Sequence, residues 1–85
     1  MIHYILGVHI TDRLKDAVRV QQLLTQHGGH IKTRLGLHEL EPGSPSPRGL
    51  LLLELAGTRE ECDALAAKLA DIDGIDVQHM VFTHP

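Results

Sequence analysis

The segment HIKTRLGLH, residues 30 to 38, combines residue types that bind metals and anions. His30 and His38 at its ends offer imidazole nitrogens, while Lys32 and Arg34 between them offer positive charge. The alternation of apolar and polar residues predicts a strand. At about 3.3 Å per residue, the two histidines would lie roughly 26 Å apart. They are therefore too distant to bind one ion within one chain.

His3 and His9 are also too distant from each other to bind one ion within one chain. The chain has seven histidines, and His3 and His9, on one predicted strand, would lie about 20 Å apart. A metal site would have to combine different strands or subunits, for instance His3 with His84, or include His79. Solvated or hydrogen-bonded histidines are the simpler interpretation. We expect no cofactor, and a metal site between subunits, drawn from His3, His9, His79 and His84, is the alternative.

A small anion is the second ligand class that the segment favours. The Arg34 guanidinium group, with Lys32 and Arg48, suits a carboxylate or phosphate, and Gly36 lets a ligand approach the backbone. His38 lies where the strand enters the following connection. The candidate ligand-binding residues are therefore Arg34, Gly36, His38 and Arg48. The alternative is a charged edge strand, because charge on an edge opposes aggregation.

Residues suited to catalysis do not form a known pattern. No combination of serine, histidine and carboxylate with catalytic spacing can be identified. Cys62 falls in the first turn of a predicted helix, where the dipole favours thiolate, but it also lies on the apolar stripe of that helix. We interpret it as a buried core residue. The acids of that helix are interpreted as a solvated face, namely Glu60, Glu61, Asp63 and Asp71. We do not expect an enzyme.

Length and charge narrow the class of protein further. The chain has 85 residues, enough for a single domain spanning residues 1–85 with one small core. A formal charge of -3 lacks the basic excess that direct nucleic-acid binding requires. The longest apolar run, at residues 50–53, is far short of the ~20 residues that span a bilayer. A single cysteine fits a reducing compartment, so we expect a cytoplasmic protein without membrane contact.

The hydrophobic pattern predicts six elements in the order β-α-β-β-α-β. The strands are expected at 2–10, 30–38, 50–55 and 75–83, and the helices from 13 to about 27 and from 59 to about 72. Thr58 and Glu61 form the T-x-x-E pattern of a capping box at the second helix. This order is the ferredoxin-like plan, an α+β fold with a four-stranded antiparallel sheet ordered 4-1-3-2 and both helices on one face.

The connection ELEPGSPSPRG, residues 39–49, differs in composition from the rest of the chain. It carries three prolines and two glycines, so it can contribute few ladder hydrogen bonds. We expect a mobile hairpin connection. An alternative function follows from it, namely a protein-interaction module that docks onto a partner enzyme through these residues.

Two helices cover only one face of such a sheet, and a chain of this length has no element left for the other. The helix-facing set is expected to be Tyr4, Leu6, Val8, Ile31, Leu35, Leu51, Leu53, Leu55, Val77 and Val81. The open face then receives Ile5, Gly7, Leu50, Leu52, Met80 and Phe82. Burying such a set, at about 25 cal/mol per Å², contributes several kcal/mol. We therefore predict a homodimer or tetramer through this face, and a monomer with a partly apolar sheet is the alternative.

Three stretches carry a resemblance to a known family. These are the run from Ile10 through Asp12 and Arg13 to Leu24, the pattern I-x-x-R-L-G at 31–36, and the pattern L-x-x-K-L-x-x-I-x-G-I-x-V at 65–77. In pattern and spacing the chain resembles the iron-only hydrogenase system regulators, which are similar in fold to ACT domains and to the C-terminal domain of the nickel-responsive repressor. The resemblance implies a ferredoxin-like oligomer with a regulatory or ligand-sensing role in an anaerobe's cytoplasm. A hydrogenase-system protein or a small anionic ligand is then the expected partner.

Two departures limit what the resemblance implies. The nickel-responsive repressor reads DNA through a ribbon-helix-helix segment, whereas here the first strand begins at residue 2, so a direct transcription factor is not expected. Its nickel site uses a His-x-His pair on a strand and a cysteine on a neighbouring strand. The matching strand here offers Lys32 and Arg34, and Cys62 lies on a helix. The nickel site does not carry over.

Overall fold

The computed structural model describes residues 2–11, 13–37 and 49–83, with the side chains of residues 13–16 and 37 left aside. Its elements follow the predicted order. They are β1 (Ile2–Ile10), α1 (Arg13–Gln26), a short 3-10 turn η1 (Gly28–His30), β2 (Ile31–Leu37), β3 (Gly49–Leu55), α2 (Arg59–Ala70) and β4 (Ile75–Thr83). The predicted connection at 39–49, which includes Arg48, lies outside the described residues except for Gly49. His38 also lies outside them.

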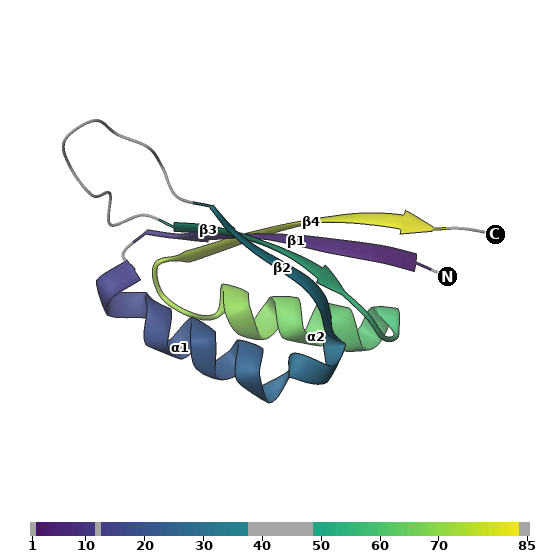
Figure 1. Cartoon of the computed structure of the whole chain (residues 1–85), viewed down its shortest axis with the longest axis horizontal. Helices are drawn as coiled ribbons and strands as arrows, with labels where there is room; N and C mark the ends of the chain where they lie inside the picture. Colours follow the sequence, from purple (N-terminus) through teal and green to yellow (C-terminus); the bar gives the residue numbers. More distant parts are fainter. Residues whose placement is uncertain (1, 12, 38–48, 84–85) are drawn as a thin grey trace.

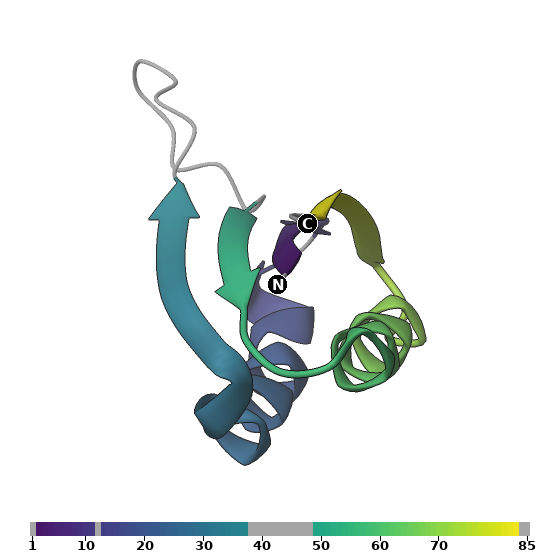
Figure 2. The same cartoon turned by 90° about the vertical axis from the view of Figure 1, so that its right-hand side faces the viewer.

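The four strands form one antiparallel sheet in the order β2-β3-β1-β4, which confirms the predicted 4-1-3-2 arrangement. Both helices lie on the same side of the sheet (Figure 1). The view along the strands shows α1 and α2 side by side below the sheet, with no described element above it (Figure 2). The prediction of one covered and one open face is therefore confirmed for the described part of the chain.

The core lies between the sheet and the helices. Alternate residues of β1 point toward the helices, because successive side chains of a strand face opposite sides. These residues pack against one stripe of each helix, as the spacing of apolar residues predicts. The buried set is Tyr4, Leu6, Val8, Ile10, Val20, Leu23, Leu24, Leu53, Leu55, Cys62, Leu65 and Leu69.

The start of α2 is fixed by the predicted capping box. The Thr58 hydroxyl oxygen accepts a hydrogen bond of 3.1 Å from the Glu61 amide, and the Thr58 amide donates one of 3.1 Å to the Glu61 carboxylate. These bonds satisfy backbone donors that the first helical turn leaves without intrahelical partners. At the other end, Gly74 has a φ of 81°, the left-handed turn that glycine adopts readily, and leads into β4.

One predicted position is wrong, and a β-bulge explains it. Leu35 was expected to face the helices, but its side chain is 52% exposed. The register shifts between Ile31 and Thr33, so Ile31 pairs with Leu55 whereas Leu35 pairs with Leu52 on the open face. An extra residue in one strand exchanges the two faces for everything after it, because the side-chain period is two.

Candidate functional site

The open face of the sheet carries five of the six large apolar side chains that are exposed in the described part of the chain. Directly paired residues share a face, and Ile5 pairs with Met80 while Gly7 pairs with Leu52. The exposed large apolar side chains on this face are Leu35 (52%), Leu50 (36%), Leu52 (37%), Met80 (56%) and Phe82 (53%). The six residues predicted for this face therefore lie there, joined by Leu35. Their role as an oligomer interface stays a prediction.

A depression lies in the middle of this face, at Gly7. Its volume is about 220 Å³, and its lining includes Ile5, Leu52, Gln78 and Met80 as well as Gly7. The missing side chain of Gly7 creates the space. A Cβ atom built there would meet the Gln78 carbonyl oxygen at 3.8 Å and Leu52 Cδ2 at 3.9 Å, which are ordinary contacts. The fold itself therefore does not require glycine at this position.

Charged groups gather at one end of the open face. The Glu54 carboxylate lies 3.3 Å from His3 Nδ1 and 3.9 Å from the Lys32 ammonium nitrogen. Glu54 is the least exposed of the three, with 28% of its side chain accessible, compared with 38% for His3 and 62% for Lys32. The carboxylate thus lies beside two potential positive charges at the edge of an apolar surface.

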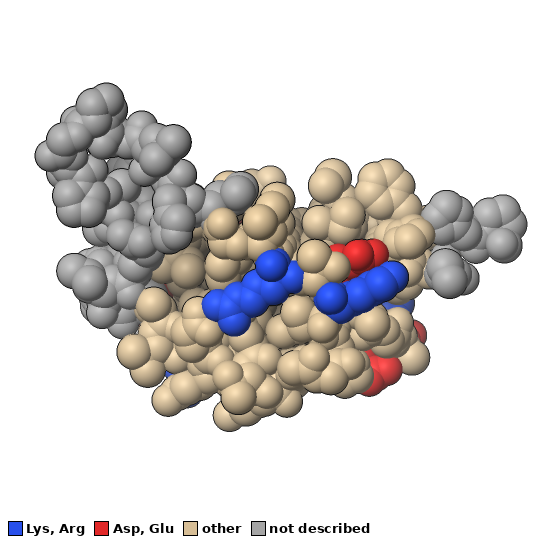
Figure 3. All heavy atoms as spheres, in the orientation of Figure 1, with Lys and Arg blue, Asp and Glu red and all other residues tan. Residues whose placement is uncertain are grey.

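The candidate anion ligands are separated from this face by the bulge. Arg34 pairs with Leu53 and Gly36 with Leu51, so both belong to the side of β2 that faces the helices, and both are exposed. Positive side chains lie along the edge formed by β2, with a negative group beside them (Figure 3). The structure thus brings Arg34 and Gly36 together, while His38 and Arg48 lie outside the described residues. Anion binding stays a prediction.

The candidate metal ligands are divided between the two faces. His3 pairs with Phe82 and His9 with Leu50 on the open face, whereas His79 pairs with Leu6 on the opposite face. His84 lies outside the described residues. Within the described residues, no three or more histidine, cysteine, aspartate or glutamate side chains are placed to hold a metal ion. Within one chain, His79 therefore lies on the opposite side of the sheet from His3 and His9, and a metal site between subunits stays a prediction.

A polar cluster that the sequence did not predict lies between the sheet and α2. The Tyr4 side chain is fully buried, and its hydroxyl donates a 2.6 Å hydrogen bond to the Asp63 carboxylate. Arg59 contacts the same carboxylate at 3.3 Å and lies 5.7 Å from the centre of the Tyr4 ring. The His79 ring stacks on the Tyr4 ring, with the two ring centroids 5.5 Å apart. The cluster ties α2 to β1 and β4.

The cluster shifts the pKa values of both its acidic groups. Burial, followed by the hydrogen bond to Asp63, raises the pKa of Tyr4 to about 12. The same hydrogen bond, followed by that from Arg59, holds the pKa of Asp63 below its usual range. The two groups therefore stay as phenol and carboxylate at neutral pH. This arrangement suits a structural link better than proton transfer, because neither group has a pKa near 7.

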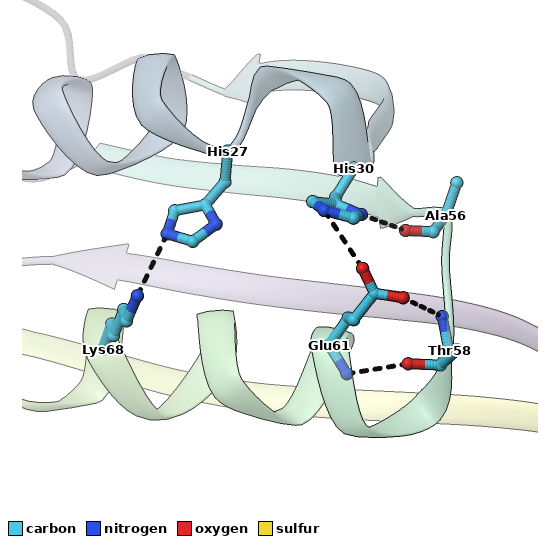
Figure 4. Close-up of polar contacts among 6 residues, drawn as sticks. All are labelled: His27, His30, Ala56, Thr58, Glu61 and Lys68. Carbon is cyan, nitrogen blue, oxygen red and sulfur yellow. Dashed lines mark hydrogen bonds and ion pairs between the residues drawn. The ribbon is translucent and has the colours of Figure 1, made fainter.

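Two histidines connect the end of α1 to α2 (Figure 4). His27 Nε2 lies 3.4 Å from the Lys68 ammonium nitrogen. His30 Nδ1 lies 3.2 Å from the Ala56 carbonyl oxygen, and its Nε2 lies 3.2 Å from the Glu61 carboxylate. The residues at both ends of the glycine pair thus contact α2 and the segment that leads into it. His30, the first residue of the segment HIKTRLGLH, therefore has partners within its own chain.

Cys62 lies in the core, as predicted. Its side chain is buried, and burial raises the pKa of its thiol. A raised pKa keeps the thiol protonated at neutral pH, whereas a nucleophilic cysteine needs thiolate.

In the described part of the chain, no helix is both long and apolar enough to cross a membrane.

Comparison with known proteins supports the fold. Neither a family model nor a curated protein matches the sequence. Among solved structures, the chain is similar to an uncharacterized protein from Thermotoga maritima, at 25% identity and a TM-score of 0.82, over 98% of this chain and 100% of that one. It is also similar to formyltetrahydrofolate deformylases from Pseudomonas putida and Pseudomonas syringae, at 14% identity and a TM-score of 0.57.

The deformylases are longer proteins. The likeness covers 92% and 95% of this chain but 28% of each deformylase, so it concerns a domain of those enzymes and shows the fold alone. Together these structures support a ferredoxin-like, ACT-like domain. None of the three names refers to a hydrogenase, so the family resemblance seen in the sequence gains fold support only.

Proposed function

We propose that this chain is a regulatory or ligand-sensing domain that works as a homo-oligomer, with no enzymatic activity of its own. The observation that carries the proposal is the open sheet face, where five large apolar side chains are 36–56% exposed. Scattered apolar residues are normal on protein surfaces, but a contiguous patch marks an interaction site. This patch lies on one side of the sheet, and a second copy carries the same patch.

The size of the face fits a dimer contact. Four strands at about 4.8 Å spacing and some seven residues at about 3.3 Å give roughly 19 by 23 Å, or about 400 Å² in projection. The accessible area of a pleated surface exceeds its projected area, so burying this whole face in two copies gives a contact at the small end of the range of specific interfaces. At about 25 cal/mol per Å², burial of its apolar part contributes several kcal/mol. A domain with a total stability of about 5–15 kcal/mol gains substantially from that contribution.

The proposal of a regulatory role rests on the family resemblance, whereas the proposal of an oligomer rests on the open face. The residue patterns at 31–36 and 65–77 resemble those of the iron-only hydrogenase system regulators. We therefore place the domain in that system and in the cytoplasm, with a hydrogenase-system protein or a small anionic molecule as its partner. Arg34 and Gly36, exposed together on β2, are the residues that we assign to an anion.

A charge on the open face tests the oligomer. Leu52→Glu places a carboxylate in the middle of the apolar patch and should convert the oligomer to a monomer. Val18→Glu is the matched control, because Val18 is 66% exposed on α1, away from the sheet. Size-exclusion chromatography with light scattering should show the wild-type mass for the control and half that mass or less for Leu52→Glu. Equal masses for the two variants would contradict the proposal.

A metal carrier or sensor is the second candidate. It gains support from the position of His3 and His9 on the open face, where a second copy would bring further histidines close. Elemental analysis of the untagged protein, with thermal shifts on adding nickel, zinc or copper, separates it from the first candidate. Stoichiometric metal that is lost on His9→Ala would favour the carrier. Metal-free protein with no thermal shift would exclude it.

A further inference from the structure

We propose that Phe82 of one copy inserts into the Gly7 depression of a second copy, and that the two copies exchange this contact across a two-fold axis. The inference rests on the proposed self-association. It adds which side chain enters which depression, and where the axis lies.

The depression has the size and chemistry for an aromatic ring. Its volume is about 220 Å³, with Ile5, Leu52 and Met80 as apolar lining. An apolar cavity of about 150 Å³ in another protein holds a benzene molecule, so this space admits a phenyl group. In water, the depression exposes apolar side chains, and filling it removes them from solvent.

Phe82 is the side chain best placed to enter it. Met80 and Leu52 line the depression themselves, which leaves Leu35, Leu50 and Phe82 among the exposed apolar side chains of this face. Phe82 is the only phenylalanine of the chain and is 53% exposed. An aromatic ring buries more area than leucine, with only two side-chain torsions to order.

Strand register fixes the position of the axis. Gly7 pairs with Gln78 and Phe82 pairs with His3, so the depression and Phe82 lie four residues apart, about 13 Å along the strands. A two-fold axis that exchanges them must bisect that distance, since each copy offers the same surface to the other. The axis therefore crosses the strands along the row of Ile5 and Met80, which pair with each other.

Residues of this row face their own equivalents in the second copy, because they lie along the axis. Ile5 lies near the axis and contacts its own equivalent in the second copy. Glu54 pairs with Ile5 in this row, so the two Glu54 carboxylates approach one another. Lys32 at 3.9 Å and His3 at 3.3 Å lie beside each carboxylate and offset the repulsion.

Filling the depression tests the inserted ring. Gly7→Met should weaken dimerisation by about tenfold or more, because the new side chain occupies the space of Phe82. The backbone at Gly7 accepts a Cβ with only ordinary contacts, and the rest of the Met side chain would extend toward the depression. Gly36→Met is the matched control, because Gly36 also lies in a strand, its Cβ would meet Leu51 Cδ2 at 3.5 Å, and it belongs to the other face. Circular dichroism checks that both variants fold.

A double-mutant cycle separates insertion from general weakening. Phe82→Ala alone should also weaken dimerisation, and Gly7→Met should add little in that background, because the ring it displaces is gone. Fully additive effects would overturn the insertion. If Leu52→Glu abolishes the dimer while Gly7→Met leaves it unchanged, self-association stands and the insertion fails. A wild-type monomer would instead contradict the proposed function.

A disulfide trap tests the axis. Ile5→Cys should cross-link two copies rapidly under mild oxidation, since the residue lies near the axis and the only native cysteine, Cys62, is buried. Asp76→Cys, on the same face but in the row of His9, is the control that should cross-link slowly. Faster cross-linking of Asp76→Cys than of Ile5→Cys would overturn the placement of the axis.

Discussion

The two faces of one sheet differ although the same strands build both. On the covered face, Tyr4, Leu6 and Val8 of β1 are fully buried against the helices. On the open face, Met80 and Phe82 of β4 are more than half exposed, although they are also apolar. Apolar patterning alone therefore does not indicate what buries a residue. The chain's own helices bury the first face, and we propose that a second copy buries the other.

Truncation of a core residue on the covered face should destabilise the protein most. Leu65 is fully buried, and Leu65→Ala should lower the free energy of unfolding by about 2–5 kcal/mol, because it leaves a cavity in the core. Leu50→Ala, at a residue 36% exposed on the open face, should cost a dilute monomer far less. Urea denaturation at low protein concentration measures both. Comparable losses would mean that the two faces do not differ as described.

A smaller effect concerns the link between the covered face and α2. Tyr4→Phe removes the 2.6 Å hydrogen bond to Asp63 and should lower the free energy of unfolding by roughly 1 kcal/mol near neutral pH. The pKa of Tyr4 is raised to about 12 in the folded chain, against about 10 when unfolded. Its contribution is therefore complete below pH 10 and is lost as the pH rises toward 12.

The loss of the Tyr4 contribution to stability at alkaline pH can be followed directly. Tyr4 is the only tyrosine, so ultraviolet absorbance of tyrosinate reports on this residue alone. We expect titration well above pH 10 in the folded protein, and near pH 10 in urea. Titration at the same pH in both conditions would show that the tyrosine is not buried against α2. The stability of Tyr4→Phe should vary less with pH over this range.

The smallest effect is on the acid side. The pKa of Asp63 is lowered by its hydrogen bonds from Tyr4 and Arg59, so its contribution to stability is present above its unfolded pKa, near 4, and is lost as the pH falls through the lower folded value. Asp63→Asn should flatten the fall in stability below pH 4. Thermal unfolding from pH 2 to pH 6 measures this, with Asp73→Asn as an exposed control. An unchanged slope would contradict the assigned contact.

Local patterns predicted most of the fold. The alternation in residues 2–10 and the spacing of Thr58 and Glu61 are short-range signals, so strand, helix and cap could be placed from them. The position of Leu35 could not be predicted, because a bulge between Ile31 and Thr33 depends on pairing with β3. The sequence signal for the polar cluster around Tyr4 is the tyrosine itself, because a tyrosine on a buried strand needs a hydrogen-bond partner for its hydroxyl.

The candidate site was predictable in part, for the same reason. The open-face set follows from strand alternation and topology, and the structure places all six predicted residues there. The Tyr4–Asp63 contact joins residues 59 positions apart, and the acids of α2 had been interpreted as a solvated face. The depression at Gly7 also depends on three strands at once. Such features need the assembled sheet.

Sedimentation equilibrium of the wild-type chain, diluted across the micromolar range, tests the open face most directly. Self-association through this face predicts a molar mass of at least twice that of the 9.4 kDa chain, falling toward one chain on dilution. Leu52→Glu should give the single-chain mass throughout. A wild-type protein that sediments as a single chain at every concentration would contradict the claim that a second copy covers the open face.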